Sequence, residues 1–67
     1  MSFQEEVAKI FKEAREKQGL TQEEVAKKAK MNTNYYAQVE RGTRNARGDV
    51  LNRIANALGI KLKLPLE

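Results

Sequence analysis

The sequence predicts a compact all-α domain of four helices, or five, followed by a short C-terminal β-strand. Apolar residues recur at helical spacing through most of the chain, and small polar residues stand immediately before the first three apolar stretches. Only residues 60–67 change to the alternating pattern that is typical of a strand. A chain of 67 residues has the length of one domain, so we expect residues 1–67 to fold as a single unit.

Capping residues predict the helix boundaries. Ser2 with Glu5 and Thr21 with Glu24 each form a capping box, in which side chains satisfy free backbone N–H groups at a helix start. Asn32 is a good N-cap for the third helix. The glycines that favour helix ends are Gly19, Gly42 and Gly59. The predicted helices cover about residues 3–18, 22–29, 33–40 and 49–58.

The alternating C-terminal segment holds its apolar residues on one face. These residues are Ile60, Leu62, Leu64 and Leu66. A lone strand leaves its backbone N–H and C=O groups unpaired. We therefore expect residues 60–67 to pair with the same strand of a second copy, which makes the four apolar residues the predicted dimer interface. The alternative is a single extended tail that folds back on its own core.

Composition argues against several kinds of chemistry. The chain has no cysteine and no histidine, which excludes disulfides, thiolate or histidine catalysis and most zinc sites. No nucleophile–base pair is visible, so we predict no enzyme and no cofactor or metal. No apolar run approaches the roughly 18 residues of a membrane span, and the charged N-terminus does not resemble a signal peptide. The first helix is net acidic, which disfavours binding to an anionic membrane surface. We expect a cytoplasmic protein, and the absence of cysteine is consistent with a reducing cytoplasm.

Positive charge is concentrated in the middle of the chain. Residues 1–26 carry net −2, residues 27–47 carry net +5 and residues 48–67 carry net +1, which together give the net +4 of the chain. An unbalanced basic segment is the electrostatic footprint of a nucleic-acid-binding surface. This distribution indicates that residues 27–47 face DNA, whereas the first third is a solvated Lys/Glu surface.

Residues 20–42 contain two short helices joined by a turn that is too tight for a flexible linker. Helical spacing turns Tyr36 and Val39 inward, so we assign Tyr36 to the core. The opposite face then carries Thr33, Asn34, Ala37 and Gln38. Amides suit adenine, a hydroxyl suits any acceptor, and apolar groups contact the thymine methyl. We predict that these four residues read bases in the major groove; a guanine contact would need Arg41 or a loop residue.

Helix starts and the loop after the third helix supply predicted phosphate contacts. Free N–H groups at a helix start bind phosphate. Gln22 and Asn32 occupy such starts, although helix capping alone would also explain Asn32. The polar and basic residues that extend this line are Arg41, Thr43, Arg44, Asn45 and Arg47. Such contacts position a protein on DNA without reading its sequence.

The motifs TQEEVAKK and MNTNYYAQVERGTRN, flanked by FKEAREKQGL and VLNRIANALGI, resemble the helix-turn-helix of the phage repressor and Cro family (XRE-like). The resemblance covers residues 7–60 and implies a helix-turn-helix at about residues 21–41 that binds operator DNA as a dimer. The family's base readers correspond to Thr33 and Asn34, with Gln38 one turn on. Its phosphate-clamping glutamine corresponds to Gln22, and its structural ion pair to Arg15 and Glu40.

The segment NYYAQVERG is similar to restriction–modification controller proteins and some antitoxins, in which the tyrosine corresponding to Tyr35 approaches the DNA backbone. Here that tyrosine could equally pack against the domain. Lys30 replaces the family's turn glycine; a left-handed backbone there costs about 1 kcal/mol, which the lysine can offset by reaching phosphate. Ala46 and Gly48 replace a proline and a leucine that are common before the fourth helix. IKLKLPL replaces the usual fifth helix and is similar to antitoxins whose C-terminal strands pair across the dimer.

The leading functional prediction is a sequence-specific DNA-binding transcriptional regulator associated with the nucleoid, acting as a repressor or autoregulator. It would bind double-stranded DNA as a homodimer on a two-fold symmetric operator, with the helix over 33–40 in the major groove. The alternative is an antitoxin that binds both its operator and a protein toxin. The C-terminal strand favours that alternative, and the lack of a disordered toxin-wrapping tail weakens it.

Overall fold

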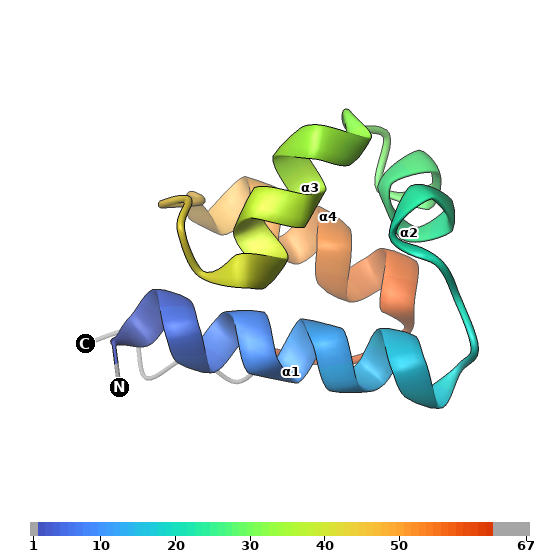
Figure 1. Ribbon diagram of the computed structural model, residues 1–67, viewed down its shortest axis with the longest axis horizontal. Coiled ribbons are helices and arrows are strands. Elements are labelled where there is room, and N and C mark those ends of the chain that lie inside the picture. The colour runs from blue at the N-terminus through green and yellow to red at the C-terminus, as the bar shows by residue number, and fades with distance from the viewer. Residues whose placement is uncertain (1, 63–67) are drawn as a thin grey trace.

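The computed structural model describes residues 2–62, which form four helices (Figure 1). They are α1 (Phe3–Lys17), α2 (Gln22–Lys28), α3 (Thr33–Arg41) and α4 (Gly48–Leu58). The predicted all-α class and the four predicted helices are confirmed, and no helix end differs from its predicted position by more than one residue. Residues 2–62 contain neither a fifth helix nor a strand. No helix in this part of the chain has the length and apolar character needed to cross a membrane.

All four helices contribute to one core. α1 packs against α3 and α4, and α2 packs against the same two helices; Figure 1 shows α3 in front of α4, with α1 running below both. The largest fully buried side chains come one from each helix, namely Phe11, Val25, Tyr36 and Ile54. Burying a side chain of this size stabilises the fold by about 1.5–3 kcal/mol. Because every helix is tied to this core, α3 is held in one orientation.

The first two helices begin with the predicted capping boxes. Ser2 Oγ accepts the N–H of Glu5 at 3.1 Å, and the glutamate side chain accepts the N–H of Ser2 at 2.9 Å. Thr21 and Glu24 repeat the arrangement at 3.0 and 2.8 Å. α4 differs, because its N-cap residue Arg47 makes no side-chain capping bond. The Asn32 side chain caps α3, so three of the four helix starts are satisfied by local side chains.

The four helices end with one common motif. A residue with a left-handed backbone follows the helix, and the next residue donates its N–H to the carbonyl five residues back, which is a Schellman motif. These bonds, at 2.9–3.1 Å, run from Leu20 to Arg15, Met31 to Ala26, Thr43 to Gln38 and Ile60 to Ala55. The left-handed residues are Gly19, Gly42, Gly59 and Lys30, with φ angles of 70°, 78°, 69° and 59°. Lys30 thus takes the place that glycine holds at the other three ends.

The predicted C-terminal strand is absent from residues 60–62. The Schellman motif at the end of α4 turns the chain back, and Ile60 and Leu62 pack, half-buried, against the core. The expected pairing of residues 60–67 with the same segment of a second copy stays a prediction. This packing matches the alternative of a tail folded on its own domain. The other two residues of the predicted interface, Leu64 and Leu66, lie outside the described residues.

Candidate nucleic-acid interface

The buried carboxylate of Glu40, in the last turn of α3, links this helix to α1 and to α2. Its side chain is only 3% exposed, and it accepts two hydrogen bonds from Arg15 of α1, at 2.8 and 2.9 Å. Gln22 Nε2, at the start of α2, donates to it at 2.9 Å, and the Tyr36 hydroxyl donates at 2.6 Å. Across residues 2–62, every buried side-chain nitrogen or oxygen has a hydrogen-bond partner. The expected Arg15–Glu40 ion pair is therefore present, as part of a larger network.

The network also sets the protonation of its members. Burial by itself would raise the pKa of Glu40, but the hydrogen bonds from Arg15, Tyr36 and Gln22 outweigh burial and hold that pKa below its usual value. The hydrogen bond to Glu40 raises the pKa of Arg15. Burial and the same carboxylate raise the pKa of Tyr36. At neutral pH, Glu40 and Arg15 are therefore both charged and form an ion pair, and Tyr36 is protonated.

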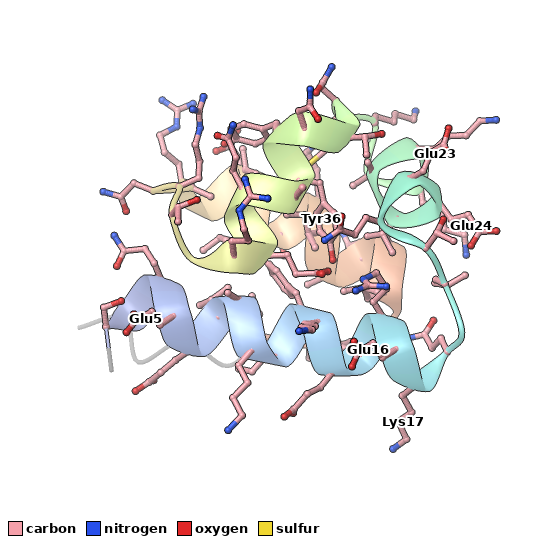
Figure 2. All side chains as sticks on the ribbon, viewed as in Figure 1. Glu5, Glu16, Lys17, Glu23, Glu24 and Tyr36 are labelled. Carbon is pink, nitrogen blue, oxygen red and sulfur yellow. The ribbon has the colours of Figure 1, made fainter. Side chains whose placement is uncertain are left out.

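The outer face of α3 carries the residues expected to read bases. Thr33 and Asn34 are exposed, and Ala37 and Gln38, one turn further along, are half-buried. Figure 2 shows Tyr36 pointing from α3 into the interior, which leaves the opposite side of the helix to these four residues. The face therefore presents two amides, one hydroxyl and two methyl groups to a partner.

Two residues expected to bind phosphate also have structural partners. Gln22 is half-buried and uses one N–H on Glu40, which leaves its second N–H and its side-chain oxygen. Asn32 Oδ1 accepts the N–H groups of Asn34 and Tyr35 at 2.7 and 3.3 Å, so Asn32 caps α3. The amide nitrogen of Asn32 is not needed for capping. Both side chains can therefore hold the fold and still donate to a phosphate.

The loop after α3 returns to the outer face of that helix. The Arg44 guanidinium lies 4.7 Å from the centre of the Tyr35 ring, and its Nη1 donates to Gln38 Oε1 at 3.2 Å. Tyr35 is half-buried and also packs against the core, and an exposed cation at this distance from its ring contributes about 0.5–1 kcal/mol. Thr43 Oγ1 donates to the backbone carbonyl of Gln38, also at 3.2 Å. The structure thus brings four residues of the expected DNA surface into one cluster.

The other residues expected to bind phosphate lie before or after α3, and they differ in how firmly other residues hold their side chains. Asn45 Oδ1 accepts a hydrogen bond from Gln4 Nε2 at 2.7 Å, which ties the loop to the start of α1. Arg47 is 84% exposed and makes only a loose contact, at 3.6 Å, with a carboxylate in the first turn of α4. Lys30 and Arg41 are exposed near the two ends of α3. Exposed basic side chains therefore stand both before and after α3 in the chain.

Three long-range contacts have no counterpart among the sequence predictions. Arg53 of α4 donates to the carbonyl of Ala29 at 3.1 Å and to that of Lys30 at 2.5 Å. It thereby caps α2 and holds the turn that precedes α3. Gln18 Nε2 donates to the carbonyl of Leu58 at 2.7 Å and joins the ends of α1 and α4. No local pattern points to these roles, because the partners are backbone carbonyls 23, 24 and 40 residues away.

The tight turn before α3, the buried network behind it and the polar face in front of it agree with a known protein family. Residues 11–64 match the family described as helix-turn-helix (HTH_3). The chain belongs to the helix-turn-helix family. The match includes the α2–α3 pair and α4, and so covers the whole expected DNA surface. A comparison with curated proteins gave no match.

A solved structure supports the same assignment. The crystal structure of the wild-type restriction–modification controller protein C.Esp1396I matches this helix-turn-helix protein with a TM-score of 0.84. The two sequences are 31% identical, and the match covers 91% of this chain and 82% of that chain. The family suspected from the sequence motifs is confirmed. Family and structural likeness together support a DNA-binding transcriptional regulator.

Proposed function

We propose that this helix-turn-helix protein is a sequence-specific transcriptional regulator, a repressor or autoregulator, that binds a two-fold symmetric operator as a homodimer. The strongest support for this proposal is that the two sides of α3 differ, because one is fixed to the core and the other faces outward. Glu40 and Tyr36 hold its inner side by hydrogen bonds, and Thr33, Asn34 and Gln38 stand on its outer side. A helix held this rigidly can enter the major groove with its reading groups already in place.

The outer face has the chemistry for direct base reading. The amides of Asn34 and Gln38 can each donate to and accept from an adenine edge, and Thr33 can bond any acceptor or contact a thymine methyl. The Arg44 side chain, bonded to Gln38, brings a guanidinium beside this face, which has no basic residue of its own. A well-formed bidentate contact contributes about 1–3 kcal/mol of discrimination against a wrong base.

Phosphate contacts would set the position of the protein on the duplex. Gln22, Asn32 and Lys30 lie before α3, and the basic and polar residues Arg41, Thr43, Asn45 and Arg47 lie at its end or beyond it. Residues 27–47 carry net +5, so binding should release several counterions. The logarithm of affinity should then fall with the logarithm of salt, with a slope of about −0.9 for each phosphate neutralised.

A homodimer would place two copies of α3 in successive major grooves, about 34 Å apart. The largest exposed apolar side chains of residues 2–62 are Phe3 and Ile10 of α1, which are 46% and 43% exposed. Ile60 and Leu62 are only half-buried and can also contribute apolar area to a dimer contact. We propose that a second copy covers part of this apolar surface. Such a DNA-bound protein would be associated with the nucleoid.

Selection of binding sites from random duplexes, with the full chain, tests the proposal. The selected sequences should contain two inverted half-sites whose centres are about 10 base pairs apart, or a multiple of that distance. Affinity for the best site should exceed affinity for random duplex by at least about a thousandfold. Equal affinity for selected and random duplexes, or affinity independent of salt, would contradict the proposed function.

A further inference from the structure

A basic cleft lies between the C-terminal end of α2 and the C-terminal half of α4. Its volume is about 360 Å³, and it is lined by Lys28, Ala29, Lys30, Arg53, Asn56 and Ala57. Three of the lining residues are cationic and none is acidic. The two alanines leave room between the helices because their side chains are short. The cleft includes none of the residues on the outer face of α3 and none from the loop after it.

The charges of the cleft are partly anchored and not neutralised. Arg53 is held by its hydrogen bonds to the carbonyls of Ala29 and Lys30, which occupy Nε and Nη2 and leave Nη1 for another partner. Lys28 and Lys30 are exposed. None of these three cations forms a salt bridge within residues 2–62. The cleft therefore presents a concentrated positive field to any molecule that enters it.

The backbone at the rim of the cleft is strained. Lys30 has a φ of 59°, whereas the equivalent residue at the other three helix ends is glycine. A left-handed conformation costs a residue with a Cβ atom about 1–2 kcal/mol. Strain of this kind concentrates at functional sites. Glycine would make the same turn without strain and without charge, so the lysine side chain itself points to a role.

We propose that this cleft is the docking site for an acidic segment of a partner protein. Carboxylates complement its three cations, the Asn56 amide can pair with a passing backbone, and the half-buried Ala57 can contact a small apolar side chain. The volume is at the low end of the range for ligand sites, about 300–1,000 Å³, and the cleft is open. A small molecule would remain largely in water there, whereas an extended chain can cross the cleft.

Duplex DNA fits the cleft poorly. Neighbouring helices pack with their axes about 8–10 Å apart, whereas the major groove of DNA alone is about 12 Å wide. A duplex could touch the lysines at the rim but could not enter between the helices. The cleft also lies at the opposite end of α2 from Gln22, about 9 Å along the helix axis. Lys30 is the one lining residue that the operator proposal also uses, as a phosphate contact. Lys28 and Arg53 belong to the cleft alone, so the docking proposal rests on them and does not depend on the proposed operator reading.

A titration of the isotope-labelled full chain, followed by NMR, tests the docking site. The probe is a short peptide of alternating glutamate and alanine, and the control peptide has glutamine in place of glutamate. We expect the amide signals of Ala29, Asn56 and Ala57 to move with the glutamate peptide only. Lys28→Glu should weaken peptide binding by at least about tenfold. Lys12→Glu, which makes the same charge change on the exposed side of α1, should weaken it by less than about threefold.

Three outcomes would overturn the proposal. The first is equal weakening by the two charge reversals, and the second is a spread of signal changes over α1; either would mean that the peptide senses only net charge. The third is a loss of affinity for random duplex with Lys28→Glu that clearly exceeds the loss with Lys12→Glu. That result would assign the cleft to nucleic acid. A peptide result as expected, with no operator found by selection, would leave the docking site intact and reject the proposed function.

Discussion

In its last turn, α3 places Glu40 among Arg15, Gln22 and Tyr36, and the carboxylate accepts four hydrogen bonds. Along its outer face, the same helix places Thr33 and Asn34 in solvent. Both regions are polar, and they lie within one short helix. They differ in whether the protein itself satisfies the polar groups.

This difference separates residues that build the fold from residues that are available to a partner. A polar residue in a helix-turn-helix is not a DNA contact by virtue of its polarity. Glu40 is committed to the interior, and removing it should affect stability first. Thr33 and Asn34 have no such commitment, and removing their side chains should affect binding and leave stability unchanged. Within residues 2–62, the Gln38 side chain is bonded only to the exposed Arg44, so its removal should cost little stability. Gln22 belongs to both groups, because it bonds Glu40 and keeps one N–H for a partner.

Glu40→Ala should produce the largest change. It leaves the Arg15 guanidinium, 14% exposed, without its carboxylate, and breaking such a pair costs about 3–5 kcal/mol. The whole free energy of unfolding of a typical domain is only about 5–15 kcal/mol, so this loss is a large part of it. Urea unfolding measures the loss. Glu13→Ala, an exposed acid on α1, should stay within about 0.5 kcal/mol of wild type. Equal losses in the two variants would show that the network does not hold α3.

Replacing Thr33, Asn34 and Gln38 together by alanine should remove sequence preference without unfolding the protein. If each contact discriminates by about 1–3 kcal/mol, the preference for the selected operator over random duplex should fall at least about a hundredfold. Fluorescence anisotropy gives both affinities, and urea unfolding should match wild type. A control triple variant on α1, at Lys9, Lys12 and Glu13, should keep the preference. A preference that survived the first set of changes would refute base reading by this face.

Acid should weaken the inner network through Glu40. The pKa of Glu40 is lower in the folded state than in the unfolded state, where it is about 4.3. Its contribution is therefore complete above that unfolded value and is lost as pH falls through the folded value. Urea unfolding across pH should show a steeper acid loss for wild type than for Glu40→Gln. Glu13→Gln should keep the wild-type slope; an identical slope for Glu40→Gln would mean that another group controls acid unfolding.

Lys30→Gly should give the smallest change, and it should be a gain in stability. Relief of the left-handed strain contributes about 1–2 kcal/mol, and the greater entropy of unfolded glycine removes about 0.4–1 kcal/mol of that. The hydrogen bond from Arg53 goes to the backbone carbonyl and should remain. Lys28→Gly removes the same charge within α2 and should instead destabilise by about 0.5–1 kcal/mol. A loss with Lys30→Gly would show that the lysine side chain stabilises the free protein.

Helix starts and ends were predictable because each depends on residues within about one turn. The capping boxes at Ser2 and Thr21 and the glycines after three helices are local patterns with local physics. Lys30 was recognisable only through the family resemblance, because it stands where the family has its turn glycine. Helical spacing likewise assigned Tyr36 to the core, where it is fully buried.

Alternation did not decide how the apolar side of the tail is covered. Ile60 and Leu62 share one side of an extended segment, which says that this side is apolar but not what covers it. In the structure the core of the same chain covers it in part, because the Schellman motif after Gly59 directs the segment back to the helices. A spacing of two residues is compatible with either result, so packing decides.

The sequence by itself determined the four helices, their caps, the inward and outward faces of α3 and the basic charge around it. These properties follow from neighbours along the chain and from the helical repeat. Only the tertiary structure decided that Glu40 binds Gln22 as well as Arg15, that Arg53 caps α2, and that Arg44 lies on Tyr35 beside Gln38. A side chain such as Gln22 or Arg53 has several partners of equal chemical suitability. Which one it meets depends on how the helices pack around the core.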